Sequence, residues 1–235
     1  PMALVDLTQA DQRGATADEA KELSKPLSLL SPRGLYWALT RAGLKLGGLL
    51  SKGIALGHQT GFDSGSTLDY VYRNEARGVP LVGTAIDRTY LDSPGWRGIR
   101  QRKLHVEELL REAMRRVAAA GQPVRVTDIA AGHGRYVLDA VLGSEIKPQA
   151  VVLRDYSDIN VRDGRALIEA KGLQGVARFD QADAFDRASL AAIEPKPTVG
   201  VVSGLYELFE NNPMVGRSLA GLAEAIPVGG YLVYT

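Results

Sequence analysis

Short apolar runs alternate with helix-like stretches through the second half of the chain. One such stretch runs from Asp158 to Lys171 and stops at Gly172. The apolar runs are residues 124–129, 151–153, 176–179, 199–202 and 231–234. Apolar strands that alternate with helices are typical of a parallel sheet flanked by helices. We therefore expect an α/β domain over residues 100–235.

The amino-terminal residues 1–99 carry a different pattern, which predicts a mostly helical cap and a lid. From residue 23 to residue 62 there is no acidic side chain, although several basic ones occur. At 100° per residue, Arg41, Lys45 and Lys52 fall in one stripe, roughly opposite a leucine-rich face. A basic amphipathic helix over 33–56 can lie on an anionic membrane surface. The alternative is a helix packed on the sheet domain with a solvated basic face.

The stretch from Gly61 to about Arg102 is rich in glycine, aromatic and charged residues. Its glycines and Pro94 predict irregular backbone. Its aromatic content favours a lid over a ligand crevice, although a loop packed down for stability is the alternative. A helix is expected to follow from Gln101 to Ala120 and to lead into the first strand.

The most informative motif follows the first strand, where Asp128, Ala130, Gly132 and Gly134 lie at alternate positions. Small residues at a strand-to-helix turn allow a ligand to approach the backbone and the positive end of the helix. A dinucleotide fingerprint needs a third glycine three residues after the second, and Val137 stands there. This position disfavours a nicotinamide-dependent oxidoreductase. No Gly-Lys-Ser/Thr follows, which excludes a Walker loop.

Polar residues also follow the next three strands. Asp155 ends the second, Asp183 follows the third, and Ser203 follows the fourth. In a parallel sheet these ends meet at one edge, where ligands bind. Instead of binding a ligand, Asp183 could cap the helix that follows it. For Asp155 that alternative is weaker, because Ser157 and Asp158 stand nearby as caps.

This ordered series resembles the class I S-adenosyl-L-methionine (AdoMet) methyltransferases, with alanine at position 130 where glycine is commonest. The resemblance implies a Rossmann-like fold and AdoMet as cofactor, with Asp155 on the ribose hydroxyls and Asp183 near the adenine amino group. If the acceptor must lose a proton, the candidate general bases at the cleft are Tyr206, Glu207, His133 and Tyr90, with Glu207 and Tyr206 ranked above His133. The cofactor-binding set is expected to be Asp128, Ala130, Gly132, His133, Gly134, Asp155, Tyr156, Asp183, Ala184, Ser203 and Gly204.

The segments 61–65, 68–72 and 95–100 further resemble a poorly characterised bacterial methyltransferase family, sometimes fused to an α/β-hydrolase domain. That context implies a small-molecule or lipid-related methyl acceptor. The family's sheet continues with two more strands, whereas this chain stops at Thr235. We expect a fragment, or a partner chain that supplies the carboxy-terminal strands.

Composition limits the remaining alternatives. The chain of 235 residues has a formal net charge of +1 and no cysteine, and its three histidines lack metal-ligand spacing. We therefore expect neither a metal site nor a nucleic-acid partner. No apolar run is long enough to span a bilayer, so a cytoplasmic location is expected, with peripheral membrane contact as an alternative. An aminopropyltransferase of the same fold and a non-catalytic AdoMet-binding or interaction module remain open.

Overall fold

The computed structural model describes residues 18, 21–22, 24–25, 27–28, 31–209 and 212–235. Its described residues up to Lys103 form one compact unit, and those from Leu104 to Thr235 form a second. The first 17 residues of the predicted amino-terminal region 1–99 lie outside the described residues. Within the part of the chain that is described, no helix is both long and apolar enough to cross a membrane.

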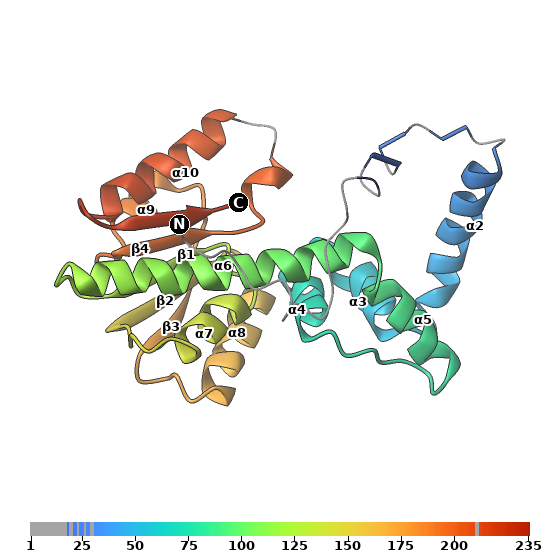
Figure 1. Ribbon diagram of the computed structural model, residues 1–235, viewed down its shortest axis with the longest axis horizontal. Coiled ribbons are helices and arrows are strands. Elements are labelled where there is room, and N and C mark those ends of the chain that lie inside the picture. The colour runs from blue at the N-terminus through green and yellow to red at the C-terminus, as the bar shows by residue number, and fades with distance from the viewer. Residues whose placement is uncertain (1–17, 19–20, 23, 26, 29–30, 210–211) are drawn as a thin grey trace. The chain divides into compact units, whose positions relative to one another are not determined.

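A parallel sheet of five strands organises the second unit (Figure 1). Its strands are β1 (Arg125–Ile129), β2 (Ala150–Asp155), β3 (Ala177–Gln181), β4 (Val199–Val202) and β5 (Tyr231–Tyr234). They lie side by side in the order β3-β2-β1-β4-β5, and all four pairings are parallel. The predicted Rossmann-like sheet is therefore confirmed, with each strand within a few residues of its apolar run.

The strand order reverses at β1, because β2 lies on one side of it and β4 on the other. Asp128 is in register with Leu153 of β2 and with Val201 of β4. The carboxyl ends of these three strands consequently lie at one edge. In open α/β sheets, ligands bind at this point of reversal.

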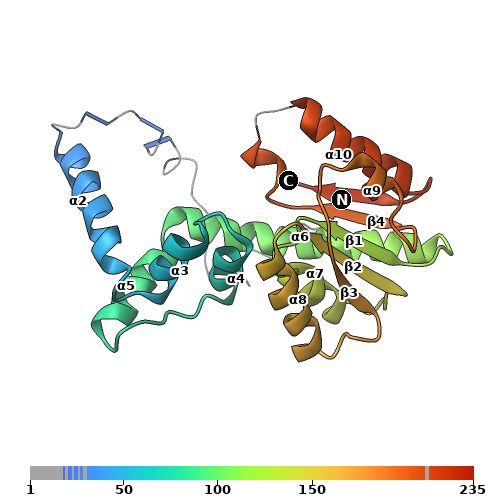
Figure 2. The same cartoon turned by 180° about the vertical axis from the view of Figure 1, so that it is seen from behind.

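Helices cover the sheet, as Figures 1 and 2 show. Beside β2 and β3 lie α7 (Arg135–Leu142) and α8 (Asp158–Ala170), whereas α9 (Arg187–Ala191) and α10 (Asn212–Ala225) lie beside β4. Ile129 and Val202 of the sheet share a core cluster with Leu190 of α9 and Leu222 of α10. Strands buried in this way are almost continuously apolar, which is why their runs were visible in the sequence.

The first unit is helical. Its helices are α2 (Pro32–Gly47), α3 (Lys52–Thr60), α4 (Gly65–Arg73), α5 (Val82–Leu91) and the first part of α6 (Pro94–Ala119). The Asp87 carboxylate is fully buried in this unit. It accepts hydrogen bonds from the backbone N–H of Gly53 at 2.7 Å and of Arg77 at 2.8 Å, and from the hydroxyls of Ser51 and Tyr70. Asp87 thus ties α3, α4 and α5 together.

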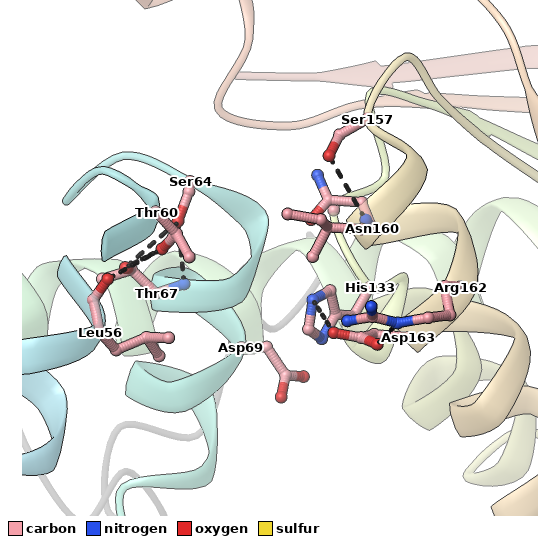
Figure 3. A network of polar contacts seen from close by, with 12 residues as sticks. Leu56, Thr60, Ser64, Thr67, Asp69, His133, Ser157, Asn160, Arg162 and Asp163 are labelled. Atoms are coloured by element: carbon pink, nitrogen blue, oxygen red, sulfur yellow. Dashed lines mark hydrogen bonds and ion pairs between the residues drawn. The ribbon is translucent and has the colours of Figure 1, made fainter. Parts of the chain in front are cut away.

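The prediction of an irregular backbone from Gly61 to Arg102 was wrong, because α4, α5 and the start of α6 occupy most of it. The Ser64 side chain caps α4, and its hydroxyl accepts a hydrogen bond from the Thr67 N–H at 3.2 Å (Figure 3). Pro94 stands at the first position of α6, where its missing N–H is not needed. Gly65 and Pro94, which suggested irregular backbone, are the first residues of α4 and α6.

The single amphipathic helix expected over 33–56 is divided in the structure. α2 ends at Gly47, and α3 begins after Ser51, whose hydroxyl caps it by accepting from the Ile54 N–H at 3.1 Å. Arg41 and Lys45 therefore share α2, whereas Lys52 belongs to α3. The predicted stripe that joined all three cations was wrong.

Candidate functional site

The turn after β1 has three residues in the left-handed region. Ala130, Gly132 and Gly134 have φ of 59°, 58° and 73°. Glycine adopts this conformation without penalty, whereas alanine is strained there by about 1–2 kcal/mol. The turn is closed by a hydrogen bond from the Gly134 N–H to the Ala131 carbonyl at 2.8 Å. This geometry explains why a glycine is favoured at the position that Ala130 occupies.

Gly134 is required for packing as well as for its backbone angle. A Cβ added at Gly134 would lie 2.3 Å from Cδ1 of Leu153, a fully buried residue of β2. That separation is far inside van der Waals contact, so α7 can start this close to β2 only with glycine there. The sequence interpretation assigned the small residue to ligand approach, and the structure adds this second reason.

Asp155 ends β2 and is almost completely buried. Its carboxylate accepts hydrogen bonds from the Gly132 N–H at 2.9 Å, the Ser157 N–H at 2.9 Å and the Asn160 side-chain amide at 3.1 Å. A carboxylate has about four acceptor positions, so one is left for a ligand donor. Asp155 thus links the glycine turn to the first turn of α8.

Asp128 lies at the centre of the sheet and is fully buried. Neither of its carboxylate oxygens accepts a hydrogen bond of good geometry from the described residues. Burial raises the pKa of Asp128 well above its ordinary value, the facing Tyr136 hydroxyl opposes the shift, and the negative charge of Asp155 adds to it. A buried carboxyl group without good partners at a strand end suits a cationic ligand group.

Asp183 is exposed after β3, and its carboxylate accepts from the Phe185 N–H at 2.8 Å. It does not cap the next helix, because Asp186 caps α9 by accepting from the Ser189 N–H at 3.1 Å. Ala184 is buried in the core cluster of α9 and α10. The Tyr156 side chain is exposed. Asp183 therefore keeps acceptor capacity at the solvent-facing edge of the site.

At the end of β4, Gly204 has φ of 77°, and its N–H donates to the Thr235 hydroxyl at 3.0 Å. Ser203 is half-buried beside it. The Tyr206 hydroxyl lies 2.9 Å from the Ser218 hydroxyl, which donates to the Ala184 carbonyl. Burial raises the pKa of Tyr206. Tyr206 is consequently protonated at neutral pH, whereas Glu207 is exposed in the short helix η1 (Tyr206–Leu208).

His133, within the glycine turn, is turned toward α8. Its Nε2 lies 3.9 Å from Oδ2 of Asp163, whose Oδ1 accepts a hydrogen bond from Nε of Arg162 at 2.7 Å (Figure 3). This arrangement places the His133 ring beside a carboxylate. Among the described residues, no group of three or more histidine, aspartate or glutamate side chains could hold a metal ion.

Two residues at this edge were missed by the sequence interpretation. Asn160 holds Asp155 from the first turn of α8, and Tyr136 faces Asp128 from α7. Both lie on helices immediately after a strand, where a side chain can reach back to the strand end. Their spacing from the acids is not distinctive in a single sequence, because an asparagine or tyrosine in a first helical turn is common.

The chain is similar to known proteins in sequence. A family model described as "Putative methyltransferase" matches residues 1–235. The "Uncharacterized protein YnbC" of Escherichia coli (strain K12) is 50% identical over 230 residues, which are 98% of this chain and 39% of that protein. The chain thus spans well under half the length of this relative.

Two solved structures are similar over part of the chain. A possible exported protein from Bordetella parapertussis matches 71% of this chain and 53% of its own, with 16% identity and a TM-score of 0.56. A SAM-dependent methyltransferase from Thiobacillus denitrificans, crystallised with S-adenosyl-L-homocysteine, matches 55% of this chain and 46% of its own, with 19% identity and a TM-score of 0.42. The TM-score with the Bordetella parapertussis protein indicates a shared fold over the matched residues.

Proposed function

This chain belongs to the methyltransferase family whose model it matches over its whole length, and we propose that it transfers a methyl group from AdoMet to a small-molecule or lipid-like acceptor. The observation that carries the proposal is the pair of acids at the reversal of strand order. Asp128 is buried without a well-placed partner, and Asp155 keeps one acceptor position.

The residues present fit AdoMet chemically. AdoMet carries a positively charged amino group and sulfonium, for which the buried Asp128 carboxyl is a suitable neighbour. Its ribose diol offers two hydroxyl donors, and the one acceptor position that Asp155 keeps would take a strong hydrogen bond from one of them. Gly132, whose N–H donates to Asp155, has no side chain that would cover the backbone beside this acid. Asp183 and Ala184 would lie toward the adenine, and Ser203 and Gly204 toward the methyl-transfer cleft.

AdoMet supplies an electrophilic methyl group, so the task of the protein is to align an acceptor nucleophile with it. Alignment alone is worth up to about 7–11 kcal/mol. An acceptor that must lose a proton also needs a base. Burial raises the pKa of Tyr206, and its one proton is donated to Ser218, whose own hydroxyl donates to the Ala184 carbonyl, so Tyr206 is poorly suited to be the base. The exposed Glu207 carboxylate is the better candidate for the base.

Ligand-dependent thermal stability tests this proposal. AdoMet and S-adenosyl-L-homocysteine should each raise the melting temperature of the chain, and NAD(H) should not. The Asp155→Ala variant should lose this response, with Asp180→Ala as a control that removes an exposed carboxylate of β3. Stabilisation by NAD(H) alone would refute the interpretation of the glycine turn.

Turnover requires a separate experiment. Incubation with AdoMet radiolabelled in its methyl group, followed by extraction of lipids and of small molecules, should transfer label to one of the two fractions. Cofactor binding without transfer to any acceptor would favour a non-catalytic binding module. Transfer of an aminopropyl group from decarboxylated AdoMet would favour the aminopropyltransferase alternative.

A further inference from the structure

A row of large apolar side chains on α2 faces solvent. Leu35, Leu39, Ala42 and Leu46 follow one another at intervals of four, three and four residues, which places them in one stripe along the helix. The three leucines are 58%, 64% and 67% exposed. Soluble proteins rarely expose contiguous apolar side chains in this way unless the surface binds something.

The opposite side of α2 is attached to its own unit. The α2 carbonyl of Leu44 lies 3.3 Å from Nε2 of His58 on α3. Gly47 is buried, and a Cβ there would meet Ile54 at 3.2 Å. Figure 1 accordingly shows α2 meeting the neighbouring helices at its carboxy-terminal end. The leucine stripe is therefore the face that the described residues leave uncovered.

A second apolar projection lies next to the end of α2. Leu81 is 86% exposed at the tip of a tight turn, which is closed by a hydrogen bond from the Val82 N–H to the Pro80 carbonyl at 3.0 Å. Its φ of 66° is strained for a leucine. The Val79 N–H donates to the Leu50 carbonyl at 2.9 Å and fixes this turn beside the segment that follows α2. Strain that holds an apolar side chain outward is typical of a functional position.

The charged side chains of α2 and of the start of α3 are all positive. Arg41 and Lys45 are exposed on α2, Lys52 is exposed at the start of α3, and no acidic residue occurs from residue 23 to residue 62. Lys45 is about 100° around the helix from Leu46, at the edge of the stripe. A second copy of the chain docked through the same face would bring cations against cations. An anionic surface would instead complement them.

We propose that α2 and the Leu81 turn form a docking surface for an anionic phospholipid bilayer. The leucine stripe would enter the boundary between head groups and acyl chains, with the cations at the level of the lipid phosphates. Each cation near such a surface strengthens binding by about fivefold. This inference does not depend on methyl transfer, because it concerns only α2, α3 and the turn at Leu81.

Co-sedimentation of the full chain with phospholipid vesicles tests the proposal. We expect binding to phosphatidylcholine vesicles that contain phosphatidylglycerol, weak binding to phosphatidylcholine alone, and release at high salt. The variant Arg41→Gln/Lys45→Gln should bind about 30-fold more weakly. Its matched control, Arg115→Gln/Arg162→Gln, removes two exposed arginines of the second unit and should bind as the unaltered chain does.

The stripe is tested by Leu39→Gln/Leu46→Gln, which should lose more than tenfold in vesicle affinity. The control Leu142→Gln/Val228→Gln alters two exposed apolar residues of the second unit. Circular dichroism would verify that each variant is folded.

Three outcomes would overturn the proposal. These are no binding at low salt, equal binding with and without phosphatidylglycerol, and binding that the α2 variants leave unchanged. A dimer that Leu39→Gln/Leu46→Gln dissociates would assign the same face to a second copy of the chain.

Discussion

Replacing Asp128 by asparagine is expected to stabilise the chain while weakening its affinity for AdoMet. Asp128 is fully buried, and its oxygens lack hydrogen bonds of good geometry. Burial raises its pKa in the folded state, so between its ordinary value and its raised value the folded chain binds more protons than the unfolded chain. Stability then falls as the pH rises through that window. Asparagine has the same shape and does not titrate.

The two effects have different magnitudes. An unsatisfied buried polar group costs about 1–3 kcal/mol, and more when it is charged. Because the amide retains part of this cost, we expect a gain of about 1–2 kcal/mol in the free energy of unfolding near pH 8. For a chain of this size each kcal/mol corresponds to about 2–4 °C in melting temperature. Because Asp128 has no exposed surface, its charge would act on the AdoMet cation without a direct hydrogen bond, and a loss of about 1–1.4 kcal/mol should lower AdoMet affinity about five- to tenfold.

The assay combines urea unfolding at several pH values with calorimetric titration of AdoMet. The stability gain of Asp128→Asn should shrink as the pH falls toward the ordinary pKa of aspartic acid. Glu224→Gln is the matched control, because it changes an exposed acid of α10 to an amide. A variant that is less stable than the unaltered chain near pH 8, with unchanged affinity, would refute the reasoning.

Three further substitutions test the turn and the β4 end. Ala130→Gly should raise the free energy of unfolding by up to about 1 kcal/mol, because relief of left-handed strain exceeds the added chain entropy; a loss in urea titration would contradict this. Gly134→Ala should lower the free energy of unfolding by more than about 2 kcal/mol. Gly121 has a similar φ of 71° but open space around it, so Gly121→Ala should show only the smaller backbone penalty. Equal losses in the two alanine variants would remove the packing argument at Leu153. Tyr206→Phe should lower stability by about 0.5–1.5 kcal/mol through its lost hydrogen bond to Ser218 and leave calorimetric AdoMet affinity within about twofold; a large loss of affinity would instead assign its hydroxyl to the cofactor.

The centre of the sheet could be predicted because β1, β2 and β4 are buried on both faces. The four residues of β4 are all buried, and such strands appear in the sequence as uninterrupted apolar runs. The strand-end acids followed from this pattern, since the parallel arrangement brings their positions to one edge. Asp128 and Asp155 were identified without coordinates for this reason.

The helical unit was harder to predict, because glycine and proline occur both in loops and at the first positions of helices. They mark loops in isolation, but Gly65 and Pro94 begin helices in the structure. The break between α2 and α3 depends on the Ser51 cap and on the buried Asp87 that Ser51 contacts. A carboxylate 36 residues away leaves no local signal in the sequence.

The partners of the strand-end acids were equally hidden. Asn160 of α8 donates to Asp155, and neither oxygen of Asp128 has a well-placed partner. Both facts depend on how the strands and helices pack, which the sequence does not show. The left-handed conformation of Ala130 also required the coordinates, since alanine gives no local indication of a positive φ.

Isothermal titration calorimetry of AdoMet into the full chain measures whether the carboxyl ends of β1 and β2 hold this cofactor. We expect one binding site per chain, with an affinity for AdoMet that falls in Asp128→Asn and in Asp155→Ala and is unchanged in Glu224→Gln. Absence of binding heat in a folded chain at several temperatures, or binding that both acid variants leave intact, would contradict this expectation.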